Sequence, residues 1–445
     1  MAILSSYNFK LRKVIGMKIE RITIHGFRNI SNTSLYLNNI SALVSLNSFG
    51  KSNLLSAIDF GISFITDDSK AKQMRWIPGI PMNKKLAGED FKFELEMTTN
   101  TESEKFWIIY GYQFKWVRDD DAGARILSEW LKVKKDKKGQ KYSQYIIRKN
   151  QKAKYKKAES GRCDHPILVD SSELVINKLQ AYDSLFFLDL VKRINNLTAH
   201  IEEHLDAGVA YQPYPFIRTD LEALQIDNIN NLPRVIYYLK EQAHEKHDLL
   251  INSYKKLFPQ IEKIEVDKVN ISENINFQIP DDVPLRVTNE IFILRVSDKN
   301  LNQPINFEAM SDGAKRILLL LTCVILSDIN KCSLIEIEEP DNCIHPSLLG
   351  QLLDIMAQLT TDCRILITSH SPYLIKFFEL ENLYIGLPSS DGIASFCRIS
   401  STGEKALLKD AKESRQSIGD YIFQLMSGSE DDIKELEKYL ECGSK

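Results

Sequence analysis

Two short apolar runs in the second half of the chain each end in polar residues, and they lie one helix apart. The first, SLIEIEE at 333–339, ends in Glu338 and Glu339, and the second, RILITSH at 364–370, ends in His370. The segment between them, HPSLLGQLLDIMAQL, has apolar residues at helical spacing. The 31 positions from Glu339 to His370 fit a strand–helix–strand unit. This predicts two neighbouring, parallel strands in one sheet.

The polar ends of these strands suit nucleotide hydrolysis. A carboxylate at such a strand end can hold Mg²⁺, often through water, and we assign this role to Glu338. The next carboxylate, Glu339, can polarise the attacking water as a general base. His370 can hydrogen-bond a γ-phosphate from the neighbouring strand. An edge strand with solvated acids is a poorer interpretation, because Ile335 and Ile337 are apolar and a proline stops the strand at once.

A glycine turn near the N-terminus supplies a candidate phosphate site. The segment LVSLNSFGKSNLL, residues 43–55, joins an apolar strand to a segment with helical spacing. In this context the N–H groups of the loop would wrap phosphates, and Gly50 would let the backbone approach closely. Lys51 would reach the β- and γ-phosphates, and the Ser52 hydroxyl would bind Mg²⁺.

Two positions of this loop that often carry glycine carry serine. The usual pattern G-x-x-x-x-G-K-[ST] begins with glycine, but here Ser45 occupies that position and Ser48 occupies a second one. The serines replace residues that let a loop adopt positive φ or pack without a Cβ atom. Asn47 and the other groups expected to touch phosphate and metal are retained, although Glu338 replaces the commoner aspartate. We therefore expect ATP to bind and to be hydrolysed slowly, or mainly for regulation.

A second candidate anion site opens a helix at Ser311-Asp312-Gly313, directly before the most apolar stretch of the chain. It lies far along the sequence from Lys51, so the loop of its own chain is not its obvious partner. The economical interpretation is that Ser311 and Gly313 cap the γ-phosphate held by a second subunit.

The middle of the chain differs from its two ends. Residues 91–150 alternate in short bursts separated by turns, which predicts an antiparallel meander, whereas residues 171–260 have helical spacing. We therefore predict an α/β fold with an inserted helical region. Its parts are an N-terminal lobe with phosphate loop and meander at 1–170, the helical insertion at 171–265, a second lobe at 266–400 and a tail at 401–445, helical from residue 416.

The composition of the chain bears on its cellular compartment and on its possible contact with membranes or DNA. Seven cysteines without a C-x-x-C pair argue against zinc and disulfide frameworks and fit a reducing compartment, so we expect a cytoplasmic protein. The most apolar stretch, 317–329, is too short to span a membrane. From Lys132 to Lys157 there are twelve Lys or Arg residues and one acid, Asp136. This basic run is either a surface that follows DNA phosphates or a pair of solvated hairpins.

The order FRN, GKSN, S-D-G-x-K-R, EEPDNCIHP and TSHSP resembles the ABC-type ATPase heads of the SMC, RecF and OLD class, often described as AAA-family ATPases. The resemblance covers residues 17–400. It implies an ABC-type P-loop ATPase head that forms a homodimer or higher oligomer around two ATP molecules with Mg²⁺, with Ser311 and Gly313 facing the partner's nucleotide. It also implies nucleotide contacts for Arg28 and Asn53.

By size and layout the chain resembles the stand-alone ATPases of anti-phage systems, such as PtuA of Septu and AriA of PARIS. Only 75 residues follow His370, without the acidic cluster of a TOPRIM nuclease, so we expect no nuclease activity in this chain. The resemblance implies a sensor or assembly scaffold that controls a separate effector, such as a nuclease or toxin. The tail is either a docking element for that partner or a solvated terminal helix. The alternative is a RecF-like DNA-repair ATPase that binds DNA directly.

Overall fold

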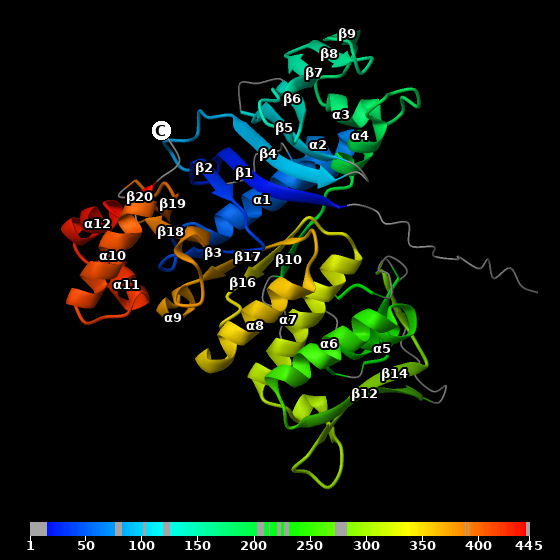
Figure 1. Ribbon diagram of the computed structural model, residues 1–445. Helices are drawn as coiled ribbons and strands as arrows, with labels where there is room; N and C mark the ends of the chain where they lie inside the picture. Colours follow the sequence, from blue (N-terminus) through cyan, green and yellow to red (C-terminus); the bar gives the residue numbers. More distant parts are fainter. Residues whose placement is uncertain are drawn as a thin grey trace, which may run out of the picture.

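The computed structural model describes residues 16–441 except 76–81, 101–103, 119–124, 203–208, 213, 220–223, 227–230, 272–282, 388 and 390. Figure 1 shows a mostly parallel sheet and an antiparallel sheet with helix α1 (Lys51–Thr66) between them. The α/β fold with an antiparallel meander and an inserted helical region, predicted from the sequence, is confirmed.

The mostly parallel sheet has seven strands in the order β10-β16-β17-β3-β18-β19-β20. The parallel strands are β10 (Ala199–Glu202), β16 (Leu334–Glu338), β17 (Arg364–Ser369), β3 (Ile40–Val44) and β18 (Leu383–Leu387). Two antiparallel strands, β19 (Ser395–Ile399) and β20 (Leu440–Glu441), complete one side. The predicted parallel neighbours β16 and β17 are therefore confirmed.

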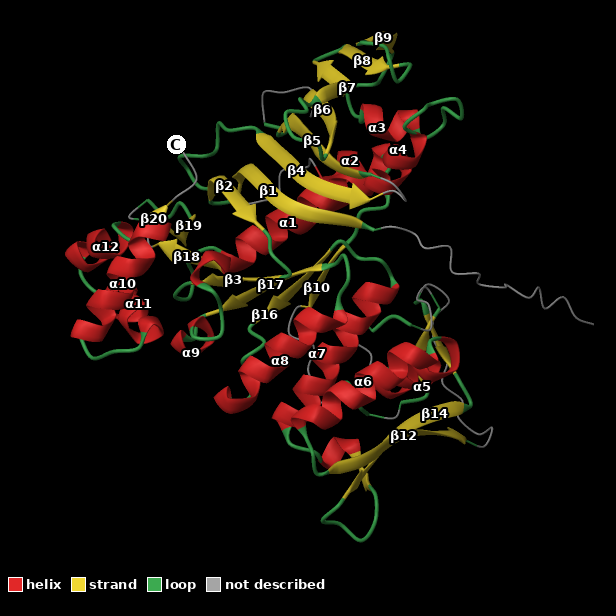
Figure 2. Ribbon diagram, in the orientation of Figure 1, coloured by secondary structure: helices red, strands yellow, loops and turns green. Residues whose placement is uncertain are grey.

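Helices cover both faces of this sheet (Figure 2). On one face, α7 (Asp312–Ile329), α8 (Pro346–Leu359) and α6 (His244–Leu257) share a buried cluster with Ile335 and Ile337 of β16. On the other face, α1 shares a second cluster with Leu334 of β16 and Leu366 of β17. Burial on both faces explains why these strands read as continuous apolar runs.

The antiparallel sheet has eight strands in the order β2-β1-β4-β5-β6-β7-β8-β9. Their bounds are β1 (Met17–Phe27), β2 (Ile30–Tyr36), β4 (Phe91–Asn100), β5 (Lys105–Lys115), β6 (Arg125–Lys135), β7 (Ser143–Lys149), β8 (Lys152–Lys156) and β9 (Cys163–Ile167). The meander predicted for residues 91–150 is thus confirmed, and it extends on both sides. Its face toward α1 is aromatic, because Phe64 of α1 stacks on Tyr112 and Phe114 of β5. Three short helices, α2 (Ser69–Arg75), α3 (Val175–Leu179) and α4 (Leu188–Asn195), lie near it.

The region expected to be helical also contributes strands. Besides α3, α4, α5 (Leu232–Gln242) and α6, it contains β10 and β11 (Phe216–Arg218), which pairs with β13 (Leu285–Val287). The helical interpretation was wrong for residues 199–202, because Ala199 pairs with Leu334 and sheet pairing overrides the local periodicity. Farther along, β12 (Ile261–Asn270), β14 (Glu290–Asp298) and β15 (Ile305–Asn306) form a small antiparallel sheet.

The tail belongs to the core. It comprises α10 (Ser401–Glu413), α11 (Ile418–Ser427) and α12 (Glu430–Glu437), and the short helix α9 (Pro372–Ile375) precedes it between β17 and β18. Leu407, Ile422 and Leu436 are buried in the same cluster as α7 and α8, so the interpretation of a solvated terminal helix is wrong.

Five described cysteines are free, whereas Cys397 on β19 is disulfide-bonded, which the sequence did not predict. Within the described ranges, no helix combines the length and apolarity needed to cross a bilayer.

Candidate active site

Three strand ends meet at one edge of the parallel sheet. In the strand register Val44 lies opposite Ser369, and Thr368 lies opposite Glu338. The loops that follow β3, β16 and β17 therefore leave the sheet side by side at its carboxyl edge, where ligands bind in open α/β sheets. The loop that contains Lys51 is thus brought beside the two glutamates and His370, although it lies almost 290 positions before the glutamates in the sequence.

The loop after β3 leads into an open helix N-terminus. Gly50 caps α1 with φ of 91°, and no side chain caps the first N–H groups of this helix. A Cβ atom at Gly50 would lie 2.7 Å from Cβ of Ala394, so only glycine fits here. Ser52 and Asn47 are exposed beside this N-terminus. Uncapped N–H groups together with the helix dipole suit a phosphate group.

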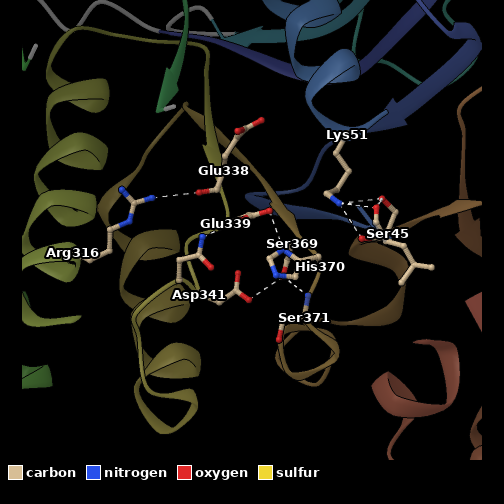
Figure 3. Close-up of polar contacts among 11 residues, drawn as sticks. Ser45, Lys51, Arg316, Glu338, Glu339, Asp341, Ser369, His370 and Ser371 are labelled. Atoms are coloured by element: carbon tan, nitrogen blue, oxygen red, sulfur yellow. Dashed lines mark hydrogen bonds and ion pairs between the residues drawn. The ribbon is translucent and has the colours of Figure 1, made fainter. Parts of the chain in front are cut away.

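Lys51 folds back over its own loop. Its Nζ donates to the carbonyl oxygens of Ser45 and Leu46, at 2.9 and 3.0 Å, and contacts Ser45 Oγ at 3.3 Å (Figure 3). Burial lowers the pKa of the Lys51 ammonium, and the carboxylates of Glu339 and Glu338 offset part of this effect. The Lys51 ammonium therefore lies close enough to the carboxylates of Glu338 and Glu339 to interact with them electrostatically.

The two serines at the usual glycine positions of the loop differ in their backbone conformation and packing. Ser48 has φ of 67°, a left-handed conformation that non-glycine residues adopt at a cost. Ser45 is completely buried, and a Cβ atom built on Gly386 of β18 would lie 2.6 Å from Ser45 Cβ. The side chain added at Ser45 is thus accommodated by a missing side chain on the neighbouring strand.

The acidic strand end is held in a strained loop. Glu339 has φ of 47°, and its Oε1 lies 2.9 Å from Nδ1 of His370 while Oε2 accepts a hydrogen bond from Asn342 at 2.8 Å. Four of the seven described non-glycine residues with positive φ lie in segments of this site: Arg28, Ser48, Glu339 and Cys343. Backbone strain of this kind gathers where surrounding structure fixes a functional geometry.

The sequence analysis missed Asp341 and Ser369. Ser369 Oγ donates to Asp341 Oδ2 at 3.1 Å, and Asp341 Oδ1 is buried without a hydrogen-bond partner. Burial raises the pKa of the Asp341 carboxyl group. The only sequence signal for Asp341 is its position two residues after Glu339, and this does not distinguish it from an ordinary acidic residue in a loop.

A chain of polar contacts joins Arg28 to the helix of the phosphate loop. Arg28 Nη1 donates to Asn53 Oδ1 at 2.9 Å, Asn53 Nδ2 donates to Asn29 Oδ1 at 2.8 Å, and Asn29 Nδ2 donates to the Gly392 carbonyl at 3.1 Å. Arg28 Nε is buried without a hydrogen-bond partner. An unpaired buried donor beside an open helix N-terminus fits a bound anionic group, so these residues suit a nucleotide.

Ser311 and Gly313 lie at the start of α7. Ser311 caps this helix and accepts a hydrogen bond from Ala314 N at 3.3 Å. A Cβ atom at Gly313 would lie 2.5 Å from the carbonyl oxygen of Cys343. Gly313 is therefore needed inside its own subunit, where the helix start packs on the loop that follows the glutamates. Its assignment to a partner's nucleotide stays a prediction.

Mg²⁺ ligation also stays a prediction. No group of three or more His, Cys, Asp or Glu side chains could hold a metal in the parts of the chain that the structure describes. Mg²⁺ commonly uses one or two protein ligands together with water and nucleotide phosphates. Ser52 and Glu338 are the residues that would hold it, and the ion would neutralise charge on the phosphates.

The basic run at 132–157 lies on β6, β7 and β8, and only some of its side chains are exposed and free to contact nucleic acid. Arg148 is 2% exposed and donates to backbone carbonyls, while Lys135 and Lys137 pair with Glu104. Tyr155 is buried, so it offers no ring to a base. Apart from Lys137, six exposed cations remain in this run: Lys138, Lys141, Lys149, Lys152, Lys154 and Lys157.

These features define a P-loop ATPase, and a family model supports this independently. The model of the AAA ATPase domain family matches residues 17–375, so the chain belongs to that family. None of the curated proteins compared with this chain is a significant match.

Several solved structures are similar to this chain. An SMC head bound to the C-winged helix domain of ScpA shares 14% identity with a TM-score of 0.44, covering 88% of this chain and 99% of that one. The SMC head domain from Thermotoga maritima shares 11% identity with a TM-score of 0.39, covering 86% and 99%. An SMC head with an extended coiled coil, bound to the C-terminal domain of ScpA derived from Pyrococcus furiosus, shares 12% identity with a TM-score of 0.39, covering 90% and 100%.

Proposed function

We propose that this chain binds ATP with Mg²⁺ at the carboxyl edge of its parallel sheet and that two copies close around two nucleotides. The observation that carries the proposal is the convergence of Lys51, the acidic strand end and His370, fixed by the pairing of β3, β17 and β16. In the closed dimer, Ser311 and Gly313 of one subunit would face the nucleotide of the other.

Each residue has a role that its contacts support. Lys51 would exchange its loop carbonyls for phosphate oxygens, and the α1 N–H groups would bind the same phosphates. Glu339 would orient and deprotonate the attacking water, held by Asn342 and His370. When the γ-phosphate is present, His370 would stabilise it.

Turnover in this proposal is slow and regulatory. Phosphate must displace the contacts that hold Lys51 on its loop, and water must compete with His370 for Glu339. The left-handed backbone at Ser48 also costs energy that glycine would not require. We therefore expect turnover well below the ~10 s⁻¹ typical of enzymes.

The wider role we propose is control of a separate effector, a nuclease or toxin, in a bacterial anti-phage system. The resemblance to stand-alone defence ATPases supports this role. The described residues after His370 also support it, because they form β18–β20 and α9–α12 on the core rather than a separate domain. Surfaces of this tail could dock the effector.

The nucleotide part of the proposal is tested with Lys51→Ala. Loss of a buried, charge-assisted contact should weaken ATP binding by about 10- to 100-fold in an equilibrium titration. Lys409→Ala is the matched control, because Lys409 is exposed on α10. Normal ATP binding by Lys51→Ala would overturn the site, and wild-type turnover near 10 s⁻¹ would overturn the slow mechanism.

The regulatory part is tested by co-purification. A nuclease or toxin encoded beside this gene should co-purify with the full chain, and Lys51→Ala should change the amount recovered. Purification of the chain without any such product, under conditions where both are expressed, would count against the role.

A second candidate function is direct DNA binding by a RecF-like repair ATPase, favoured by the exposed lysines on β6–β8 and their connections. Replacing Lys138, Lys149, Lys152 and Lys154 with Gln should then abolish salt-sensitive DNA binding, since each phosphate contact contributes to the salt dependence. Unchanged DNA affinity in this variant would exclude the basic surface.

A further inference from the structure

A buried ion pair ties the start of α7 to the edge of the parallel sheet. Arg316 on α7 donates from Nη1 and Nη2 to the two carboxylate oxygens of Glu202 on β10, at 2.6 and 2.8 Å. Glu202 is completely buried and Arg316 is 7% exposed. A forked guanidinium–carboxylate pair fixes the relative orientation of its partners more closely than a single contact does.

Arg316 also reaches the end of the acidic strand. Its Nη2 donates to the backbone carbonyl of Glu338 at 3.3 Å (Figure 3). In the register of β10 and β16, Glu202 lies opposite Ile337, the residue before Glu338. One side chain therefore holds α7, β10 and the strand end that carries Glu338 and Glu339 in a fixed relation.

The elements that Arg316 joins serve different nucleotides in the dimer proposed above. Ser311, five residues before Arg316, would face the ATP of the partner, whereas Glu338 and Glu339 would face the ATP of their own chain. Buried ion pairs add little net stability, because desolvation offsets much of their attraction. A geometric role therefore explains this pair better than a stabilising role does.

We propose that Arg316 and Glu202 are positioning residues that couple the two nucleotide sites of the dimer. This inference rests on the proposed function. When the end of β16 adjusts to bound nucleotide, the shift passes through Arg316 to the first turns of α7 and alters the surface offered to the partner. The coupling is reciprocal, so closure on the partner's nucleotide also sets the position of Glu338.

The test uses Glu202→Gln in the full chain, which keeps the side chain's size and one oxygen acceptor but removes the charge. Three quantities are measured: affinity of dilute protein for a fluorescent ATP analogue, ATP-dependent dimerisation by ultracentrifugation, and the Hill coefficient of ATP hydrolysis. We expect affinity within about twofold of wild type, dimerisation weakened about tenfold, and a Hill coefficient that falls from above 1 to about 1.

Glu20→Gln is the matched control. Glu20 pairs with Arg364, another buried arginine, at the amino end of β17 and away from the site. Equal behaviour of the two variants overturns the coupling, whereas wild-type protein that binds ATP without dimerising overturns the proposed function instead. If Glu202→Gln does not fold, Arg316→Lys, which keeps the charge but loses the fork, replaces it. Normal dimerisation and cooperativity in Arg316→Lys would likewise overturn the coupling.

Discussion

The fit between Ser45 and Gly386 gives a quantitative prediction about the unusual phosphate loop. A Cβ atom at Gly386 would lie 2.6 Å from Ser45 Cβ, about 1 Å inside ordinary contact, and 3.1 Å from Phe396 Cε1. Overpacking of this kind costs about 1–3 kcal/mol, while alanine in a strand otherwise gains about 0.5–1 kcal/mol over glycine. Gly386→Ala should therefore lower the free energy of unfolding by about 1–2 kcal/mol.

The same substitution should behave differently once Ser45 is glycine. Removing the Ser45 side chain removes the nearest obstacle, so Gly386→Ala should then be nearly neutral, which gives a coupling free energy of about 2 kcal/mol. Ser45→Gly alone should cost about 1 kcal/mol, because Lys51 loses the contact with Ser45 Oγ but keeps its carbonyl acceptors.

Urea unfolding of wild type, both single variants and the double variant measures this coupling, and ATP titration of the same proteins shows whether it reaches the phosphate site. Gly88→Ala is the control, because a Cβ atom there meets nothing within 4 Å, and its effect should be the same in both backgrounds. The reasoning would be refuted if Gly386→Ala lowered the free energy of unfolding by the same amount, to within about 0.5 kcal/mol, in the wild-type protein and in the Ser45→Gly variant.

Three further predictions concern the loop helix and the antiparallel lobe. Gly50→Ala should abolish ATP binding and lower the free energy of unfolding in urea by about 2 kcal/mol or more, because it adds a close contact at a position with positive φ. The control is Gly139→Ala, which also has positive φ but has open space around the added Cβ atom, so it should lower the free energy of unfolding by only about 1 kcal/mol. Asn53→Ala should weaken ATP binding about 3- to 10-fold in a titration by releasing Arg28, whereas Asn53→Asp should retain binding. Burial raises the pKa of Glu129 to about 7, so between about pH 4.5 and 7 the native protein binds a proton that the unfolded chain has released. The free energy of unfolding should therefore fall by about 3 kcal/mol at most as pH rises through this window, and it should level off above the window. In urea unfolding, Glu129→Gln should remove this pH dependence. An unchanged pH dependence in the variant would show that Glu129 is not the group responsible.

The central strands and the motifs at their ends were predictable because their information is local. A run such as RILITS is apolar at every position, since β17 is buried on both faces, and a polar residue after such a run marks the edge of the sheet. The spacing of one helix between Glu339 and His370 then placed them on neighbouring strands, and the structure puts their side chains 2.9 Å apart.

Contacts between distant residues were not predictable in this way. Strand β10 has four residues, and its pairing partner β16 lies more than a hundred positions away, so the local pattern of AHIE cannot reveal it. The fit of Ser45 to Gly386 likewise depends on the adjacency of β3 and β18. Each of these features becomes visible only when the order of strands in the sheet is known.

The strand order of the parallel sheet also sets when this protein can fold during its synthesis. β3 pairs with β17 and β18, and β16 pairs with β10, so neighbouring strands come from widely separated parts of the chain. The ribosome adds about 5–20 residues per second, so the roughly 320 residues between Lys51 and His370 take about 15–60 s to appear. During that interval β3 lacks both of its neighbours, and its apolar side chains depend on chaperones or the growing antiparallel sheet for cover.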